Sequence, residues 1–430
     1  HSETKPAHDK KPQKTSIFQR ILPIFLKQKN GRTPRYLLIG SVVALLVISI
    51  LLVPFQHVIL KMLPFDDKSE LQIIVDMKEG TTLESTNQLM VELVSELNAF
   101  EDVKHAVAYT GISSPINFNG LVRQYFLRQG THLGDIQIML TDKHERSQQS
   151  HEIALQMREV VDRIADKYDA SLKLVEVPPG PPVISPLVAE IYGDHYPQQI
   201  ADTKNIAQLF EAVDHMVDID TTVEYDAPKQ VLEIDLPKAM QAGVSQQQIT
   251  TTVNTALAGM DMSFLHNQHN KYAQPIRLEI DRNKQNDLNQ LMTVPIKTQR
   301  GDFIQLGELV TVVDTVIEKS IQHKDLRPMT MVTADIAGGA DSPLYGMFGA
   351  KKLIEDQYPE IDQYFIDQPL ITDSTYIKWD GEWQITYETF RDMGIAYSVG
   401  LILIFLLIVA HFHSYFVPLI IMAPIPLTII

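Results

Sequence analysis

The sequence predicts a membrane protein of mixed α and β structure, with a large folded region between membrane-spanning helices. Residues 36–55 contain no charged side chain, and two more uncharged runs lie at 393–410 and 415–430. More than 330 residues of ordinary water-soluble sequence separate the first run from the second. A helix of about 20 apolar residues spans the hydrocarbon layer of a bilayer, whereas core helices of soluble proteins rarely lack a polar face over this length. We therefore expect membrane crossings at 36–56, 393–411 and 414–430.

The charge distribution predicts how the chain is oriented in the membrane. Residues 1–35 carry nine Lys and Arg against two acids, although the whole chain has a net charge of −16. Short basic flanks stay in the cytoplasm, so the acidic region between the spans is expected on the other side, which is the periplasm in a bacterium. An acidic surface also argues against a nucleic-acid partner.

The ends of the sequence carry two further expectations. The chain begins with His and stops inside an apolar run, so we expect it to be a fragment of a longer protein. Residues 1–35 form a basic arm, in which 15–28 place their apolar residues on one side. This segment is either a short helix in the headgroup region or a plain linker.

Beyond the first span, the periodicity is that of an α+β protein. A strand (71–77), an amphipathic helix (83–100) and a second strand (103–109) form a β-α-β unit, and this pattern recurs three times. Two such units make a ferredoxin-like sandwich, so the sequence predicts two sandwiches. The later units are 135–140, 152–168 and 172–177; 187–192, 197–213 and 217–225; and 329–336, 344–358 and 364–379.

Two segments interrupt this repeat. The Pro-rich stretch 177–183 is expected to be a stiff connector, because Pro fixes φ and blocks both helix and ladder. Residues 228–328 separate the third unit from the fourth and are expected to be an inserted domain. Its predicted elements are a strand (231–236), a helix (245–258), a polar loop (266–272) and further strands at 276–280, 294–296 and 310–313.

This organisation resembles the C-terminal half of the resistance-nodulation-division (RND) efflux permeases, of the acriflavine-resistance type. The resemblance covers roughly residues 15–430 and rests on the order and spacing of five local motifs. They are LPFDD at 63–67, MKEGTT at 77–82, LPKAMQAGVS at 236–245, QLGEL at 305–309 and AHFHSYFVP at 410–418.

The resemblance implies a fold class, an activity and partners. It implies a membrane protein with two ferredoxin-like porter subdomains in the periplasm and a docking domain inserted in the second. It also implies export of small amphiphilic compounds by proton antiport, as a homotrimer in the inner membrane with an adaptor protein and an outer-membrane channel. The expected boundaries are 66–180 for the first porter subdomain, 181–227 with 327–385 for the second, and 228–326 for the docking domain.

The connection at 111–131, between the units of the first sandwich, is where we expect substrate contact. More than 20 residues without clear periodicity is long for a connection inside a compact domain, and such loops are usually functional or mobile. By position it matches the family's switch loop, although an ordinary surface or trimer-contact loop is the alternative. The candidate residues supply apolar walls and a few polar anchors: Asn117, Phe118, Arg123, Tyr125 and Phe126.

Other constellations have structural explanations. His266 and His269, with Asp261, could outline a metal site, but a solvated loop explains them better. His411 and His413 are expected in a turn at the cytoplasmic interface. Packing explains the alternating Met329 and Met331 better than a soft-metal pathway does, and Trp379 and Trp383 suit an aromatic belt at the membrane interface.

The sequence offers no catalytic group and no proton relay. It contains no cysteine, no phosphate-binding Gly-rich loop, no G-x-S-x-G and no H-E-x-x-H, so we predict neither an enzyme nor a cofactor. Residues 393–430 carry no Asp, Glu, Lys or Arg, so no proton-relay residue is named. A non-transporting periplasmic scaffold and a protein-export accessory of similar architecture are the alternatives to a transporter.

Overall fold

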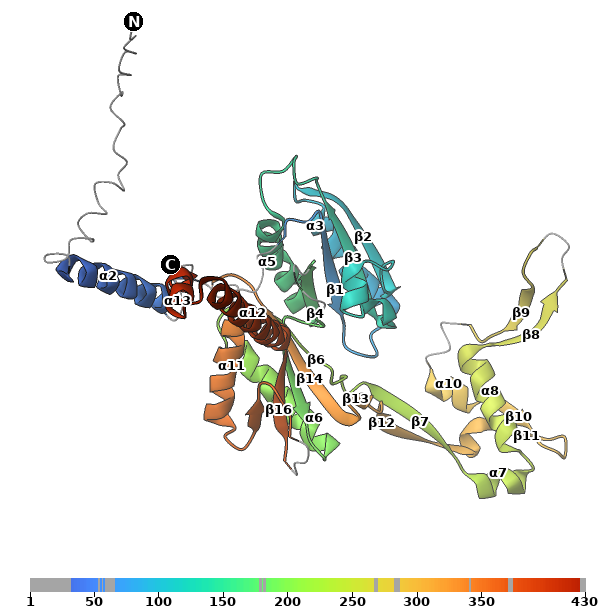
Figure 1. The fold of residues 1–430 in the computed structure, drawn as a ribbon. Coiled ribbons are helices and arrows are strands. Elements are labelled where there is room, and N and C mark those ends of the chain that lie inside the picture. The colour runs from blue at the N-terminus through green and yellow to red at the C-terminus, as the bar shows by residue number, and fades with distance from the viewer. Residues whose placement is uncertain are drawn as a thin grey trace, which may run out of the picture. The chain divides into compact units, whose positions relative to one another are not determined.

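The computed structural model describes residues 32–52, 55, 57–58, 66–177, 180, 183–266, 270–281, 287–339, 342–369 and 374–425. The chain divides into two compact units, which are coloured by residue number in Figure 1. One unit comprises His1–Met77, Leu83–Val223 and Ile321–Ile430, and the other Lys78–Thr82 and Glu224–Ser320. The predicted helix at 15–28 and most of the Pro-rich connector lie outside the described residues.

Two helices in the described part of the chain are long and apolar enough to cross a membrane. They are α2 (Arg32–Leu51) and α12 (Glu382–Phe412), whose apolar windows have mean hydropathies of 2.1 and 2.6. The helix containing the second predicted span thus begins well before residue 393, because α12 continues directly from a strand. The third apolar run contains α13 (Phe416–Met422), and 426–430 lie outside the described residues.

The first sandwich is a four-stranded antiparallel sheet with two helices on one face. Its elements are β1 (Glu70–Asp76), α3 (Leu83–Leu97), β2 (Val103–Ile112), β3 (Gln129–Leu140), α5 (Ser150–Tyr168) and β4 (Ser171–Glu176). The strand order is β2-β3-β1-β4 (Figure 1). Because side chains alternate along a strand, Leu71, Ile73 and Val75 face the helices and are buried against Leu93 and Met157. Gln72 and Ile74 are left on the opposite, helix-free face.

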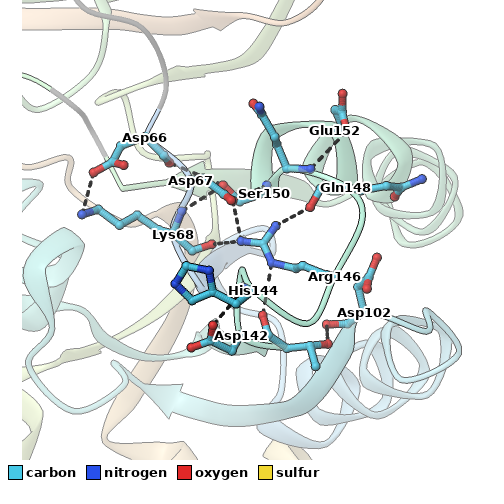
Figure 2. A network of polar contacts seen from close by, with 12 residues as sticks. Asp66, Asp67, Lys68, Asp102, Asp142, His144, Arg146, Gln148, Ser150 and Glu152 are labelled. Carbon is cyan, nitrogen blue, oxygen red and sulfur yellow. Dashed lines mark hydrogen bonds and ion pairs between the residues drawn. The ribbon is translucent and has the colours of Figure 1, made fainter.

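A buried arginine fastens the beginning of this sandwich to the loop before α5. The Arg146 side chain is fully buried and donates to the carbonyls of Gln148 (2.7 Å), Lys68 (3.0 Å) and Thr141 (3.1 Å). It also pairs with the Asp67 carboxylate, which accepts from the Ser150 amide at 2.9 Å. Figure 2 shows the guanidinium at the centre of this network. Asp67, the last residue of the LPFDD motif, therefore holds the chain directly before β1 in place.

The second sandwich repeats the same plan. Its elements are β5 (Leu187–Tyr192), α6 (Tyr196–Glu211), β6 (Met216–Thr221), β13 (Gln322–Lys324), β14 (Arg327–Ile336), α11 (Pro343–Gln357), β15 (Asp362–Tyr364) and β16 (Tyr376–Gly381). The strands run in the order β13-β14-β5-β16-β15, and β6 pairs with the other half of β14. The predicted continuous segment 364–379 is in fact two strands, of which β15 runs parallel to β16.

Trp379 belongs to the core of this sandwich. Its side chain is fully buried, its ring stacks on Phe210 and Phe365, and its indole N–H donates to Gln363 at 3.0 Å. Trp383 is partly buried and donates to the Phe365 carbonyl at 2.8 Å. The predicted aromatic belt at the membrane interface is therefore wrong for Trp379, because β16 directs this side chain toward the helices of its own sheet.

The second unit combines a two-stranded ribbon with a small helical core. The ribbon pairs β7 (Pro228–Ile234) with β12 (Val310–Val316), and Ala239, Ile249 and Leu306 lie in the core. The predicted strand at 231–236 ends early, because Asp235 caps α7 by accepting from the Lys238 amide at 3.0 Å. The remaining elements are α7 (Leu236–Ala242), α8 (Gln246–Ala258), β8 (Met260–Leu265), β9 (Gln274–Leu278), α10 (Leu288–Met292), β10 (Pro295–Lys297), β11 (Phe303–Gln305) and η2 (Leu306–Glu308).

Candidate functional site

The connection between β2 and β3 is more structured than the sequence predicts. Strand pairing continues to Ile112 and Gln129, so both ends of the predicted 111–131 loop belong to the sheet. Between them lie α4 (Phe118–Val122) and the single 3-10 turn η1 (Tyr125–Leu127). The periodicity was not visible in the sequence because two such short elements contain too few residues to show it.

A buried polar cluster holds this connection on the helix-free face of the first sheet. The Gln72 amide donates to both carboxylate oxygens of Asp135 at 2.8 Å, and Asp135 also accepts from the Ser114 amide at 2.9 Å. Asn117 donates to Gln72 at 3.2 Å while its side-chain oxygen caps α4 by accepting from the Gly120 amide at 2.6 Å. Asn117, a predicted substrate contact, thus positions the connection in this structure.

The other predicted contact residues differ in exposure and in the groups that they contact. Phe118 is half-exposed and Phe126 is also exposed. Tyr125 lies partly buried, with the Arg128 guanidinium 5.9 Å from its ring centroid. Arg123 interacts electrostatically with Asp335 of the second sandwich, and its Nε is buried without a hydrogen-bond partner among the described residues. The five predicted residues therefore have different surroundings in this structure.

Ion pairs join the two sandwiches at the edge strands β4 and β6. Lys173 of β4 contacts Asp76 at 3.2 Å and also pairs with Asp220 of β6. Burial alone would lower the pKa of Lys173, but the two carboxylates outweigh it and raise that pKa. Arg158 of α5 binds Asp218 through two parallel hydrogen bonds of 2.9 and 3.0 Å, the geometry in which a guanidinium binds a carboxylate most strongly.

The Asp335 carboxyl group lies in the same charged region, and its pKa is strongly raised. Burial, together with the neighbouring Asp218 carboxylate, raises the pKa of Asp335 to about 7. Arg123 and Arg158 act in the opposite direction but do not restore the ordinary value. Asp335 also accepts from the amide of Ile336 at 2.8 Å. The contacts between the sandwiches therefore contain a carboxyl group that titrates near neutral pH.

A cavity of about 540 Å³ lies on the helix-free face of the second sheet. Gln124, from the connection between α4 and η1, contributes to its wall, and its backbone is in the left-handed region with φ of 61°. Of the other twelve lining residues, six are aliphatic or methionine and five are polar or charged. The other lining residues are Val183, Ile184, Val188, Glu190, Gln322, His323, Lys324, Met329, Met331, Asp380, Gly381 and Ile385.

Two carboxyl groups and one ammonium meet in this cavity. The Lys324 ammonium is hydrogen-bonded to both Glu190 and Asp380, and the Tyr192 hydroxyl donates to Glu190 at 2.9 Å. Burial and a hydrogen bond with Asp380 raise the pKa of Glu190. Burial would also raise the pKa of Asp380, but the hydrogen bonds from Glu190 and Lys324 lower it. Glu190 is therefore the member of the pair that holds a proton more readily.

Sequence reasoning missed most residues of this cavity. Gln124 lies between two predicted contact residues, but Glu190, Lys324 and Asp380 come from three strands that are far apart in the chain. A single charged residue inside an apolar strand is the signal that could have found Glu190, in the run Leu187–Tyr192. The alternating Met329 and Met331 are packed as predicted, 5% and 7% exposed, yet they also line the cavity.

The remaining histidine constellations gain no support as sites. Asp261 pairs with Arg277 at 3.2 Å, and His269 lies outside the described residues. His411 packs its ring edge-on against Phe412 at 4.7 Å between centroids. Within the described residues, no group of three or more His, Cys, Asp and Glu is arranged to hold a metal ion.

Comparison with known proteins adds a family and a fold. The model of the AcrB/AcrD/AcrF family matches residues 15–430. Two crystal structures of a heavy metal efflux pump, in crystal forms II and I, match with TM-scores of 0.75 and 0.71, each at 16% sequence identity. They align over 96% and 94% of this chain, which spans about 40% and 39% of their length. A comparison with curated proteins finds no match.

Proposed function

The chain belongs to the AcrB/AcrD/AcrF family of RND permeases, and from this we propose that it is the C-terminal half of a permease that exports small amphiphilic compounds by proton antiport. The family comprises transporters and not enzymes. The family model extends over 15–430, and the chain spans about 40% of the solved pumps it resembles. The proton-carrying residues are proposed to lie in the other half of the permease.

The proposed topology uses both apolar helices as crossings. RND permeases are inner-membrane proteins, and α2 and α12 enclose the whole water-soluble region between residues 52 and 381. The basic arm would lie in the cytoplasm and the two sandwiches in the periplasm, as porter subdomains. The unit of Lys78–Thr82 and Glu224–Ser320 would be the docking domain, and the run containing α13 a third crossing.

The observation that carries the proposal is the cavity on the second sheet. Its volume of about 540 Å³ and its aliphatic and thioether walls suit a small amphiphile, because such sites are mostly apolar with a few placed polar groups. Gln124 links the cavity to the connection that was predicted to contact substrate. We propose that Phe118, Arg123, Tyr125 and Phe126 meet substrate after this connection rearranges.

Unsatisfied polar atoms support such a rearrangement. The Asn119 side chain is fully buried, and neither its nitrogen nor its oxygen has a hydrogen-bond partner among the described residues. The Arg123 Nε is in the same condition. An unpaired buried polar group costs about 1–3 kcal/mol, so another conformation of α4 that pairs these atoms would be accessible. The ion pairs of Lys173 and Arg158 would break and re-form as the sandwiches open and close.

The proposed partners follow from the family. RND permeases work with an adaptor protein and an outer-membrane channel in tripartite pumps. We propose the same partners for this chain, with a homotrimer as the functional state.

A second candidate substrate class is a soft metal ion. The two structural relatives are described as a heavy metal efflux pump, and Met329, Met331 and His323 all line the cavity. Thioethers and imidazoles are ligands for Cu(I) and related ions. Export of metal ions instead of amphiphiles is therefore the alternative for the same cavity.

The test is susceptibility of a deletion strain, complemented with the complete permease, to dyes, bile salts, antibiotics and metal ions. Amphiphile export predicts restored tolerance to dyes and bile salts, and that tolerance disappears when the proton gradient is dissipated. Restored tolerance to copper or silver alone selects the metal alternative. Transport that survives an uncoupler but stops on ATP depletion contradicts proton antiport. If the deletion strain remains as tolerant of all these compounds as the wild type, the result favours the non-transporting scaffold.

A further inference from the structure

The charged group in the cavity is a carboxyl pair with two positive neighbours from the protein itself. They are Lys324, at the open side, and Lys378, whose Nζ lies 3.8 Å from Glu190. Lys324 is the last residue of β13, and its ammonium contacts both Glu190 of β5 and Asp380 of β16. The Glu190 side chain is 1% exposed, whereas Lys324 is 37% exposed and Asp380 is 21% exposed. The acids therefore belong to the sheet, and the ammonium reaches them from the side that is open to solvent.

A tight turn holds Lys324 at this position. Lys324 pairs with Arg327 across the hairpin, and the two intervening residues, Asp325 and Leu326, have φ of 52° and 66°. Positive φ at both central positions is the conformation of a type I′ turn, whose twist matches paired strands but which usually requires Gly or Asn. Here, a 96% exposed Leu326 occupies the second position. The hairpin thus presents Lys324 to the acids in a fixed register.

The arrangement resembles a binding site for an organic cation that is already occupied. An aliphatic stem ending in an ammonium lies between two carboxyl groups, among Met329, Met331 and Val188. A cationic ligand at this point must displace the Lys324 ammonium, which is hydrogen-bonded to both carboxyl groups, whereas Lys378 lies 3.8 Å from Glu190 alone. A neutral ligand needs no such exchange.

We propose that Lys324 is a specificity-determining residue, a tethered cation that fills the cation position of the cavity and biases it toward neutral amphiphiles. This inference rests on the proposed function of the cavity as a substrate site. It predicts that removing the ammonium, with the carboxyl groups kept, converts the cavity into a site that prefers cations.

The experiment measures binding by the purified 430-residue chain in detergent micelles. Two probes differ in charge and share a tetrahedral centre with aryl groups: tetraphenylphosphonium, a cation with four phenyl groups, and triphenylphosphine oxide, which is neutral and has three. Lys324→Met is expected to raise affinity for the phosphonium about tenfold or more, because the freed carboxylate gains a partner. Affinity for the neutral probe is expected to stay within about threefold. Lys324→Arg keeps the positive charge and is expected to bind like the wild-type chain.

Two further measurements separate charge selection from a change of shape. In the double variant Lys324→Met, Asp380→Asn, the gain in affinity for the phosphonium is expected to disappear. In Lys324→Met, phosphonium affinity is also expected to rise with pH as Glu190 loses its proton. The groups that face Glu190 are Asp380, Tyr192 and Lys378, whose Nζ lies 3.8 Å from Glu190, and His323 lines the same cavity. Circular dichroism verifies that each variant is folded.

The outcomes distinguish this inference from the proposed function. Equal changes in affinity for both probes, or no gain for the phosphonium in a folded Lys324→Met chain, overturn the inference alone. If neither probe binds to any variant, the inference falls and the cavity is also removed from the proposed function. Efflux by the complete wild-type permease is measured separately, so its result tests the proposed function and not the role of Lys324.

Discussion

The two sandwiches share one chain plan but use their helix-free faces differently. In the first, Gln72 of β1 and Asp135 of β3 are buried by the connection that follows β2, and they bond to Ser114 and Asn117 of that connection. In the second, Glu190 also lies in the middle of the first strand, but it faces a cavity. One of its positive partners, Lys324, comes from a hairpin beside the sheet.

The difference shows how two copies of one fold can serve different purposes. One copy holds a loop in place, and the other forms a ligand cavity. A polar group that local chain covers and pairs adds rigidity, because every partner is fixed by the same sandwich. A polar group that is left facing a cavity can exchange its partner for a ligand. The first sandwich therefore stabilises the position of Gln124, whereas the second provides most of the cavity wall.

The largest effect is expected at the anchor of the first sandwich. Arg146→Ala removes a fully buried guanidinium with four acceptors and should destabilise this sandwich by about 3–5 kcal/mol, because three backbone carbonyls lose a donor and Asp67 loses its charged partner. Hydrogen exchange of the β1 and β3 amides measures the loss. The two tryptophans of the chain, Trp379 and Trp383, both lie at the second sandwich, so their fluorescence reports whether the effect spreads. The matched control is Arg163→Ala, whose exposed pair with Glu96 contributes about 1 kcal/mol or less; an equal effect of both changes would contradict the anchor.

A somewhat smaller loss of stability is expected when the buried polar cluster of the first sandwich is disrupted. Asp135→Ala leaves the Gln72 amide and the Ser114 N–H without their acceptor and should cost about 2–4 kcal/mol, since each unpaired buried group costs about 1–3 kcal/mol. Exchange of the amides at 113–117 should accelerate more than exchange in β4. Asp142→Ala, an exposed acid of the same sandwich, serves as control. If Asp135→Ala is as mild as this control, then the cluster does not hold the connection.

A pH-dependent effect is expected where the sandwiches meet. The pKa of Asp335 is raised to about 7, while an unfolded Asp titrates near 3.9. Between these values the folded chain holds a proton that the unfolded chain has lost, so stability falls as pH rises from about 4 to 7. Asp335→Asn should remove this fall in stability, which amounts to at most about 1.4 kcal/mol per pH unit. The tryptophan-monitored unfolding of both chains at pH 5 and pH 8 measures it, and an unchanged difference between wild type and variant at the two pH values would refute the assignment.

The smallest loss of stability is expected at Glu190, on the helix-free face of the second sheet. Glu190→Gln keeps a carbonyl oxygen that can accept from the Tyr192 hydroxyl and from Lys324, so it should change stability by less than about 1 kcal/mol. Glu190→Ala removes the acceptor of the Tyr192 hydroxyl and of Lys324, and about 1–3 kcal/mol is expected for it. Urea unfolding followed by tryptophan fluorescence compares the two. Equal losses would mean that the hydrogen bonds accepted by Glu190 do not stabilise the folded chain.

The elements with strong periodicity could be predicted from the sequence. The strand expected at 71–77 is β1 (Glu70–Asp76), and the helix expected at 83–100 contains α3 (Leu83–Leu97). The family was also recognisable, because its motifs are short local patterns in a fixed order. The elements that were missed are short or lie on exposed hairpins, where too few side chains are buried to produce a pattern. They are α4, η1, α7, β8, α10, β11, η2 and β13.

The amino-acid sequence by itself determined which segments are apolar enough for a membrane, the β-α-β repeat and the family. These properties depend on residues close together in the chain, whose spacing fixes which face is buried. Only the tertiary structure decided that Trp379 lies in a core, that Asn117 caps a helix, and that Lys324, Glu190 and Asp380 surround one cavity. Strands that are distant in the sequence become neighbours through sheet order and register, and no local pattern records which neighbours these will be.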